Sequence, residues 1–136
     1  MNTGDFAALE SIHAPGCRNH APGPFDVEPW PQEGRPFGPS EFRGTVEWIR
    51  ANQPDIHVEI ESLVAEGDEV VAWVRATGTP TGAGGPIPPT GAPVDFAQAH
   101  RFRIHDARIV EHWAVRDDLR SMIQAGVVPT PPGVPA

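Results

Sequence analysis

The sequence predicts an α+β fold, in which a curved antiparallel sheet packs against helices. Two observations lead to this fold class. Apolar residues recur at helical spacing in the first third of the chain, and after Asp55 they alternate with polar residues, as in half-solvated strands. The chain has 136 residues, about the length of one domain. We therefore expect a single domain over 1–126 and a Pro-rich C-terminal tail over 127–136.

The first helix is expected over residues 4–13, where Phe6, Leu9 and Ile12 recur at three-residue spacing. The following segment, 14–38, is dense in Pro and Gly and is predicted to be a loop. A loop of this length inside a compact domain is usually functional or mobile.

The second helix is expected to start at Gly38-Pro39-Ser40-Glu41, with Pro at the first helical position and an acidic residue in the first turn. Its apolar face carries Phe42, Val46 and Ile49. The segment Asn52-Gln53-Pro54 is expected to end it.

Four strands are predicted to follow as a meander. The first starts after Asp55 and ends at the turn Glu66-Gly67-Asp68, and the others cover about 69–79, 94–104 and 108–115, with a Pro/Gly loop over 79–93. A closing helix is then capped by Asp117 and ends before Gly126. Its inner face is expected to carry Leu119, Met122 and Ile123.

The charge balance excludes several classes of function. Ten Lys+Arg against 18 Asp+Glu give a formal net charge of −8, which disfavours binding to nucleic acid or to an anionic membrane surface. No apolar run approaches the roughly 20 residues needed to span a bilayer, and no secretory signal is visible. The lone Cys17 is expected to be buried and inert, which fits a cytoplasmic protein. All ten basic residues are Arg, so lysine Schiff-base chemistry is excluded.

The last hairpin decides where two histidines lie. If His105-Asp106-Ala107 is a three-residue loop, His100 lies directly across from His112 on one face of the sheet. A two-residue Asp106-Ala107 turn would shift the register by one and send the imidazoles to opposite faces. Such a turn needs positive φ at both central positions, which Ala tolerates badly. The three-residue register is therefore favoured.

The order of elements and several short motifs resemble one family. The motifs are Gly4-Asp5, Asn19-His20, Gly38-Pro39, residues 65–72 (AEGDEVVA), Gly78-Thr79, Pro89-Thr90-Gly91 and Ile109-Val110-Glu111-His112-Trp113. Together they resemble the SnoaL-like polyketide cyclases of the nuclear transport factor 2-like superfamily. The resemblance covers nearly the whole chain, and its motifs are more specific for the fold than for the reaction.

The resemblance implies a cone-shaped α+β barrel, in which the curved sheet and the helices enclose one deep apolar pocket. Members of this family close rings by intramolecular aldol condensation without a cofactor, and relatives hydroxylate, isomerise, open epoxides or only bind ligands. A homodimer or higher homo-oligomer is also implied, through the outer face of the sheet, where Trp73 is expected. Fold alone does not decide among these reactions.

Two departures from the family pattern affect the expected function. A catalytic aspartate follows two residues after the histidine of the family's His-Trp pair, and this chain has Ala114 there. The family also has a longer first helix, whereas three residues precede Gly4 here. We therefore expect that part of the pocket lid is absent or that the chain start is atypical.

The predicted imidazole pair can support proton transfer. Two histidines facing each other in a dry pocket should not both be charged, so at least one stays neutral and basic near pH 7. Such a base could take a proton α to a carbonyl of a polyketide-like substrate. His112 is the preferred base and His100 its partner, while Asn19 and Gln98 could polarise the carbonyl oxygen.

The same register places four apolar residues on the pocket side: Phe96, Phe102, Ile104 and Val110. The resemblance places Asn19 and His20 at the pocket rim. The full set of expected substrate-binding residues is His20, Trp30, Phe42, Val46, Phe96, Gln98, Phe102 and Ala114. The three other histidines, His13, His57 and His105, are expected to face solvent.

Other interpretations stay open. His100 and His112 could be satisfied core histidines, and Asn19 could only brace its loop. No cofactor is expected, and two histidines are too few ligands for a metal site. The glycines of 82–85 do not lie between a strand and a helix, so they do not form a phosphate cradle. The protein is thus expected to be a cofactor-free cyclase or isomerase, a pocket protein without catalytic activity, or a member repurposed for hydroxylation or pericyclic cyclisation.

Overall fold

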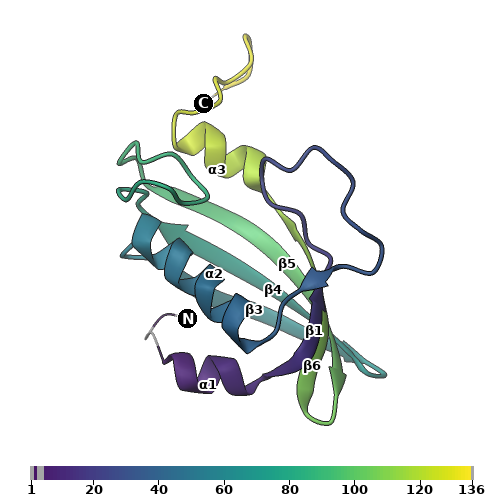
Figure 1. Cartoon of the computed structure of the whole chain (residues 1–136). Coiled ribbons are helices and arrows are strands. Elements are labelled where there is room, and N and C mark those ends of the chain that lie inside the picture. The colour runs from purple at the N-terminus through teal and green to yellow at the C-terminus, as the bar shows by residue number, and fades with distance from the viewer. Residues whose placement is uncertain (1, 3–4, 136) are drawn as a thin grey trace.

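The computed structural model describes residue 2 and residues 5–135. Predictions that fall on Gly4 and Ala136 lie outside the described residues. The elements, in chain order, are α1 (Phe6–Ser11), β1 (His13–Asn19), β2 (Arg35–Pro36), α2 (Pro39–Asn52), β3 (His57–Glu66), β4 (Glu69–Gly78), β5 (Val94–His105), β6 (Arg108–Arg116) and α3 (Asp118–Gln124) (Figure 1). The predicted α+β class is confirmed, with a six-stranded sheet and three helices in this part of the chain.

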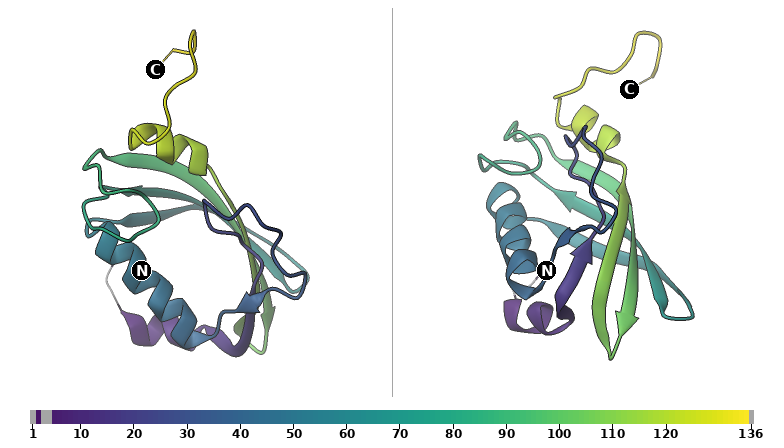
Figure 2. Two further views of the ribbon diagram at one scale, coloured as in Figure 1. Left: turned by 45° about the horizontal axis from the view of Figure 1, so that its top comes forward. Right: turned by 45° about the vertical axis from the view of Figure 1, so that its right-hand side comes forward.

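The sheet has the strand order β2-β1-β6-β5-β4-β3. All neighbouring strands are antiparallel except β1 and β6, which run parallel. The sheet is strongly curved, α1 and α2 lie together across its hollow side, and α3 lies at one end (Figure 2). The face of the sheet turned toward α1 and α2 is called the inner face below.

Apart from His13, the first two strands lie inside the segment 14–38, which we predicted to be a loop. Pro15 and Gly16 disfavour a strand locally, yet β1 pairs with β6 over His13↔Ile109 and Asn19↔His112. Its hydrogen-bonding partner lies near the other end of the chain, where local sequence patterns carry no information about it. The helix predicted over 4–13 is correspondingly shorter, because its last residue is already in β1.

The β5–β6 turn also differs from the prediction. Asp106 and Ala107 form a two-residue turn with φ of 49° and 59°, so the three-residue loop is wrong. Ile104 accordingly pairs with Ile109, but Arg103 pairs with Glu111. Val110 is therefore an extra residue in β6, a β-bulge, and not a regular inward-facing strand position.

The bulge restores the alternation that the short turn would have reversed. Beyond it His100 pairs with Ala114 and Phe102 with His112. Directly opposed residues share a face of the sheet, so both histidines are on the inner face. They are diagonal neighbours and not directly opposite, because the pairing is shifted by two residues from the predicted one: His100 is opposite Ala114 and not His112.

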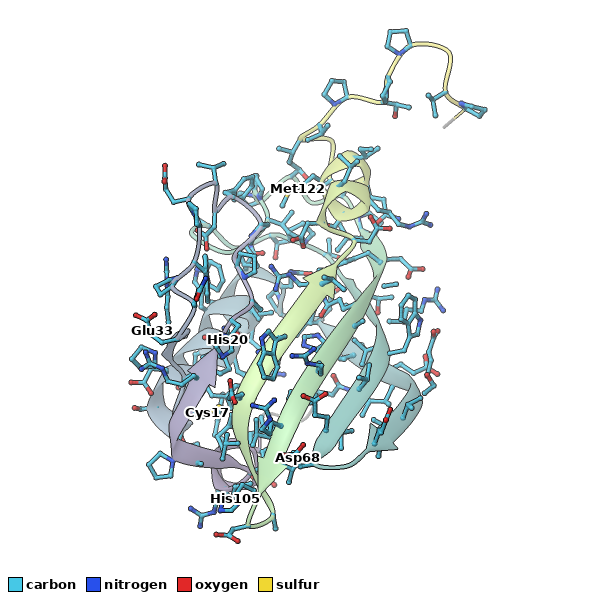
Figure 3. All side chains as sticks on the ribbon, turned by 90° about the vertical axis from the view of Figure 1, so that its right-hand side faces the viewer. Cys17, His20, Glu33, Asp68, His105 and Met122 are labelled. Carbon is cyan, nitrogen blue, oxygen red and sulfur yellow. The ribbon has the colours of Figure 1, made fainter. Side chains whose placement is uncertain are left out.

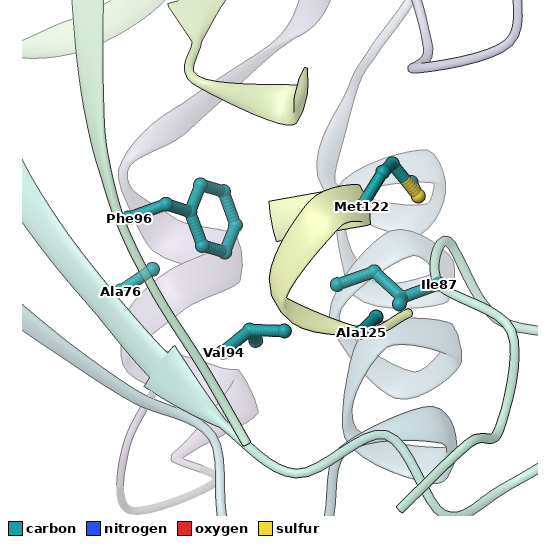
Figure 4. Packing of buried hydrophobic residues seen from close by; sticks show 6 residues of the cluster. All are labelled: Ala76, Ile87, Val94, Phe96, Met122 and Ala125. Atoms are coloured by element: carbon teal, nitrogen blue, oxygen red, sulfur yellow. The ribbon is translucent and has the colours of Figure 1, made fainter. Parts of the chain in front are cut away.

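The hydrophobic core lies between the sheet and α3. Its buried members are Ala76, Ile87, Val94, Phe96, Met122 and Ala125 (Figure 4), and Val128 packs against them. Asp117 caps α3 as predicted, accepting a hydrogen bond from the backbone N–H of Arg120. Leu119 was expected on the inner face of this helix, but it is 63% exposed.

The glycine-rich part of the 79–93 loop packs on the C-terminal end of α2. The Asn52 side chain is fully buried and donates to the carbonyl oxygens of Gly82 and Ile87 at 2.6 and 2.9 Å. A Cβ on Gly85 would overlap the Asn52 side chain, and a Cβ on Gly82 would overlap the Ala51 carbonyl. These glycines therefore allow close approach between a loop and a helix.

Candidate active site

Four polar side chains from three strands form a hydrogen-bonded row on the inner face. Nδ1 of His100 lies 2.8 Å from Nε2 of His112, and the outer nitrogens contact Gln98 Oε1 at 2.8 Å and Asn19 Oδ1 at 2.9 Å. We call Gln98, His100, His112 and Asn19 the histidine row. The structure thus brings together the three predicted catalytic residues and one predicted carbonyl-polarising residue; their roles remain predictions.

Asn19 reaches His112 because β1 runs parallel to β6, with these two residues in register. Its Oδ1 also accepts the backbone N–H of Ala21 at 3.0 Å, an Asx-type contact that we considered from the sequence. The backbone N–H of His20 donates to the carbonyl oxygen of His112 at 2.7 Å. The side chain of Asn19 and the backbone of His20 therefore both bind to His112 and hold this part of the chain to β6.

Aromatic rings surround the two imidazoles. Phe102 lies 5.1 Å from His112 and 6.1 Å from His100 between ring centroids, in stacked orientations. Phe37 stacks on His112 at 5.9 Å and meets Phe42 edge-on at 5.7 Å. These rings limit contact between the imidazoles and water: His112 is 8% exposed, whereas His100 is half-buried.

Burial keeps both imidazoles neutral. Loss of hydration lowers the pKa of His100 to about 4, and the positive charge of Arg116 contributes in the same direction. Loss of hydration also lowers the pKa of His112 to about 3, followed by repulsion from His100, His13, Arg116 and His20. Both side chains are therefore unprotonated bases at pH 7, as the sequence predicted for at least one.

The position of the absent family acid is next to the row. Ala114 is the residue directly opposite His100, so a carboxylate there would have been beside the imidazole. Two residues further along, Arg116 pairs with Gln98 and is held by Asp118 at 3.3 Å. The two successive inward-facing positions of β6 beside the row are therefore occupied by the methyl group of Ala114 and the positive charge of Arg116.

Not every expected binding residue is near the row. Among those that are, Phe102 touches both imidazoles, and Phe42 connects to His112 through Phe37. Phe96 shares their face of β5 but belongs to the core under α3, and Val46 is fully buried on α2.

His20 lies on the opposite face of the sheet and not at a rim beside the row. Its ring stacks on Trp113 at 4.7 Å, and its Nε2 lies 2.9 Å from a Glu111 oxygen. Figure 3 shows His20 on the outer side of the sheet at the end of β1. Alternation along β1 explains this position, because the neighbouring Asn19 faces inward. Trp30 lies in the following loop, where its Nε1 donates to Asp26 at 2.6 Å.

Three residues near the row were not predicted. His13, which we expected in solvent, is 3% exposed and stacks on Phe42 at 4.0 Å. Phe37 follows the short β2 strand, and no periodic pattern marks it. Arg116 could have been found, because strand alternation from Ala114 places it on the same face. His57 and His105 are exposed as expected, and Cys17 is buried, with burial raising its thiol pKa to about 11.

Two hollows on the surface lie away from the row. One is lined by Glu61, Arg75, Asp95, Phe96, Ala97, Asp117 and Arg120, and the other by Ala14, Pro15, His105, Asp106, Arg108 and Val110. Neither contains a residue of the histidine row, so the deep apolar pocket implied by the resemblance stays a prediction.

Among the described residues, no group of three or more His, Cys, Asp or Glu is placed to hold a metal ion. Over the same part of the chain, no helix has both the length and the apolar character needed to cross a bilayer.

Comparisons with solved structures support the fold and the family. IdmH from Streptomyces antibioticus, described as a candidate polyketide cyclase, is 32% identical over 93% of this chain and 90% of its own, with a TM-score of 0.74. TsrD from Streptomyces laurentii is 27% identical over 93% and 87%, with a TM-score of 0.75. AclR from Streptomyces galilaeus, a candidate hydroxylase, is 22% identical over 97% and 81%, with a TM-score of 0.75, and shows only that the fold is shared.

No curated protein sequence matches the chain. The family model of the SnoaL-like polyketide cyclases matches residues 1–125, nearly the whole chain. The fold, the motifs and this match agree, and we conclude that the chain belongs to the SnoaL-like polyketide cyclase family.

Proposed function

We propose that the protein is a cofactor-free acid/base enzyme that closes a ring, or moves a double bond, in an apolar carbonyl-bearing substrate of the polyketide type. One observation carries this proposal: two neutral imidazoles in direct contact, surrounded by aromatic rings. An imidazole must be neutral to accept a proton from a C–H bond next to a carbonyl, and at pH 7 both rings are in this form.

Within the row, His100 is the residue we assign to proton exchange with the substrate. Each imidazole has both nitrogens engaged within the row, but the His112 ring is the more buried. Its partner Asn19 is also fixed by the backbone N–H of Ala21, whereas Gln98 beside His100 has no second partner of this kind among the described residues. His112 therefore supports His100. This assignment reverses the roles expected from the sequence, where His112 was the preferred base.

The proposed reaction balances without a cofactor. His100 takes a proton from the carbon next to a carbonyl, and the C–H electron pair forms an enolate. The enolate carbon then attacks a second carbonyl of the same molecule, forming the ring bond. The new alkoxide oxygen takes the proton back from His100, which returns to its neutral form.

Single His100→Ala and His112→Ala variants test these roles, with His57→Ala as a control on an exposed strand position. A panel of linear β-polyketo esters is followed by mass spectrometry for ring closure and for deuterium uptake at the methylene positions. We expect each row variant to lose at least about 100-fold in rate while retaining its circular dichroism spectrum. Row variants that fold and turn over the panel like the control would refute the proposal.

A pocket protein without catalytic activity is the second candidate. The absence of a carboxylate at Ala114 favours it, because this position faces His100 directly. Ala114→Asp separates the two candidates. A gain of ring closure in this variant, from an inactive wild type, indicates that the site has lost its acid; tight ligand binding with no gain favours a binding role.

A homodimer through the outer face of the sheet is the assembly we propose. Val64, Val71, Trp73 and Val115 are between 37% and 73% exposed, and their pairings place them on one face. Exposed apolar side chains clustered on a sheet are typical of protein–protein contacts.

A further inference from the structure

The histidine row contains three hydrogen bonds that involve ring nitrogens, but two neutral imidazoles carry only two ring N–H groups. Asn19 Oδ1 and Gln98 Oε1 are carbonyl oxygens, so each needs an N–H from its neighbouring ring. The contact between the two rings needs one more proton. The row therefore requires three ring protons, whereas two neutral imidazoles carry two.

One end of the row is fixed by a second partner. Asn19 Oδ1 accepts both the His112 Nδ1–H and the backbone N–H of Ala21 at 3.0 Å. Turning this amide over would place its NH2 group against a backbone donor. His112 consequently carries its proton on Nδ1, and its Nε2 accepts the Nδ1–H of His100.

At the other end of the row, no second hydrogen-bond partner among the described residues fixes the orientation of the Gln98 amide. Gln98 contacts the row through one amide position, 2.8 Å from Nε2 of His100. The oxygen and the NH2 group of an amide have nearly the same shape, and either fits this place. A protonated pair would satisfy the oxygen orientation, but burial and the nearby positive charge of Arg116 oppose a cation here.

We propose that Gln98 is a positioning residue that donates its amide N–H to Nε2 of His100 in the resting protein and turns over to accept from this nitrogen when His100 takes a proton. In the resting arrangement every hydrogen bond of the row has one proton: Gln98 to His100, His100 to His112, and His112 to Asn19. After proton uptake at His100 the row holds three ring protons, and the amide oxygen accepts the third.

This inference rests on the proposed function only for where the extra proton comes from. His100 Nε2 is the ring nitrogen that changes its proton, because the other three nitrogen positions keep their partners in both arrangements. A substrate C–H therefore approaches His100 Nε2 beside the Gln98 amide. Once Nε2 has taken the proton, the amide turns over, and its oxygen accepts the Nε2–H and stabilises the imidazolium that forms together with the enolate.

The tautomers provide a test that needs no substrate. In protein labelled with ¹⁵N-histidine, long-range ¹H–¹⁵N spectra at pH 7 should show both row histidines protonated on Nδ1 and unprotonated on Nε2. Assignment uses His100→Phe and His112→Phe variants. A resting His100 protonated on Nε2, or a row cation at pH 7, overturns the proposal.

Substitutions at Gln98 provide the second arm. Gln98→Glu offers only acceptor oxygens and a negative charge, so the pKa of the His pair should rise by about 1–3 pH units. Gln98→Met removes the donor, and part of the His100 population should shift to the Nε2–H tautomer. Gln32→Glu, the same change on an exposed loop residue, should leave the pair unaffected.

The two arms separate this inference from the proposed function. If the β-polyketo esters are turned over, the acid limb of the rate profile should move with the pKa in Gln98→Glu and stay in place in Gln32→Glu. Expected spectra without any turnover would support the Gln98 assignment and refute the enzymatic role. An unchanged pair pKa in a folded Gln98→Glu would refute the assignment.

Discussion

Replacing Ala107 with glycine is expected to stabilise the protein, because Ala107 adopts a left-handed backbone conformation. Asp106 and Ala107 have φ of 49° and 59° in the β5–β6 turn. For a residue with a Cβ this conformation costs about 1–2 kcal/mol, and glycine avoids that cost. Asp tolerates the conformation better than Ala, so the gain should be larger at 107 than at 106.

The size of the effect is the difference between two terms. Glycine relieves about 1–2 kcal/mol of backbone strain, but it increases the conformational entropy of the unfolded chain, which costs about 0.4–1 kcal/mol. Ala107 is exposed, so little side-chain contact is lost. We expect a net gain of about 0.5–1 kcal/mol, which corresponds to a rise in Tm of about 2–4 °C for a domain of this size.

Differential scanning calorimetry and urea unfolding measure this change. Ala83→Gly is the matched control, because Ala83 is an exposed loop residue outside the left-handed region; its stability should fall or stay unchanged. An Ala107→Gly protein no more stable than this control would refute the strain at the turn. The β5–β6 register, on which the histidine contact depends, would then need another explanation.

Three further predictions concern the row, the loop and the assembly. The free energy of unfolding should be highest above pH 6.5 and should fall as the pH is lowered toward 4. The reason is that His100 and His112 take up protons near pH 6.5 in the unfolded chain but only near 4 and 3 in the folded chain. Urea unfolding should show a smaller decrease in this free energy for His112→Phe than for the wild type. Gly85→Ala should cost about 1–3 kcal/mol through overlap with Asn52, measured by thermal unfolding; an unchanged Tm would contradict this. Val115→Glu should convert the proposed dimer to a monomer in light scattering, and a mass unchanged from wild type would exclude this surface.

Elements with local stabilising contacts were predictable. The Pro at the start of α2 and the Asn-Gln-Pro segment at its end agree with its bounds, Pro39–Asn52. The alternation after Asp55 likewise predicts β3 to β6 to within about two residues at each end. Strand β1 escaped prediction because Pro15 and Gly16 weaken its local signal, and its partner β6 lies near the other end of the chain.

The contact between His100 and His112 was predicted from an incorrect register. The two-residue turn at Asp106 and Ala107 shifts the pairing by one, and the bulge at Val110 shifts it again, so the inner face is recovered. The sequence contains no strong signal for such a bulge. The shift at the turn and the shift at the bulge together keep the two histidines on one face of the sheet, but as diagonal neighbours.

By itself the sequence determined the family, the fold class and the face of each strand residue relative to its neighbours, because alternation along a strand is local stereochemistry. Only the tertiary structure decided that Asn19 completes the row and that its neighbour His20 faces outward against Glu111. These outcomes depend on which distant strands pair and in what register. That choice is made by burial over the whole sheet and not by any short segment.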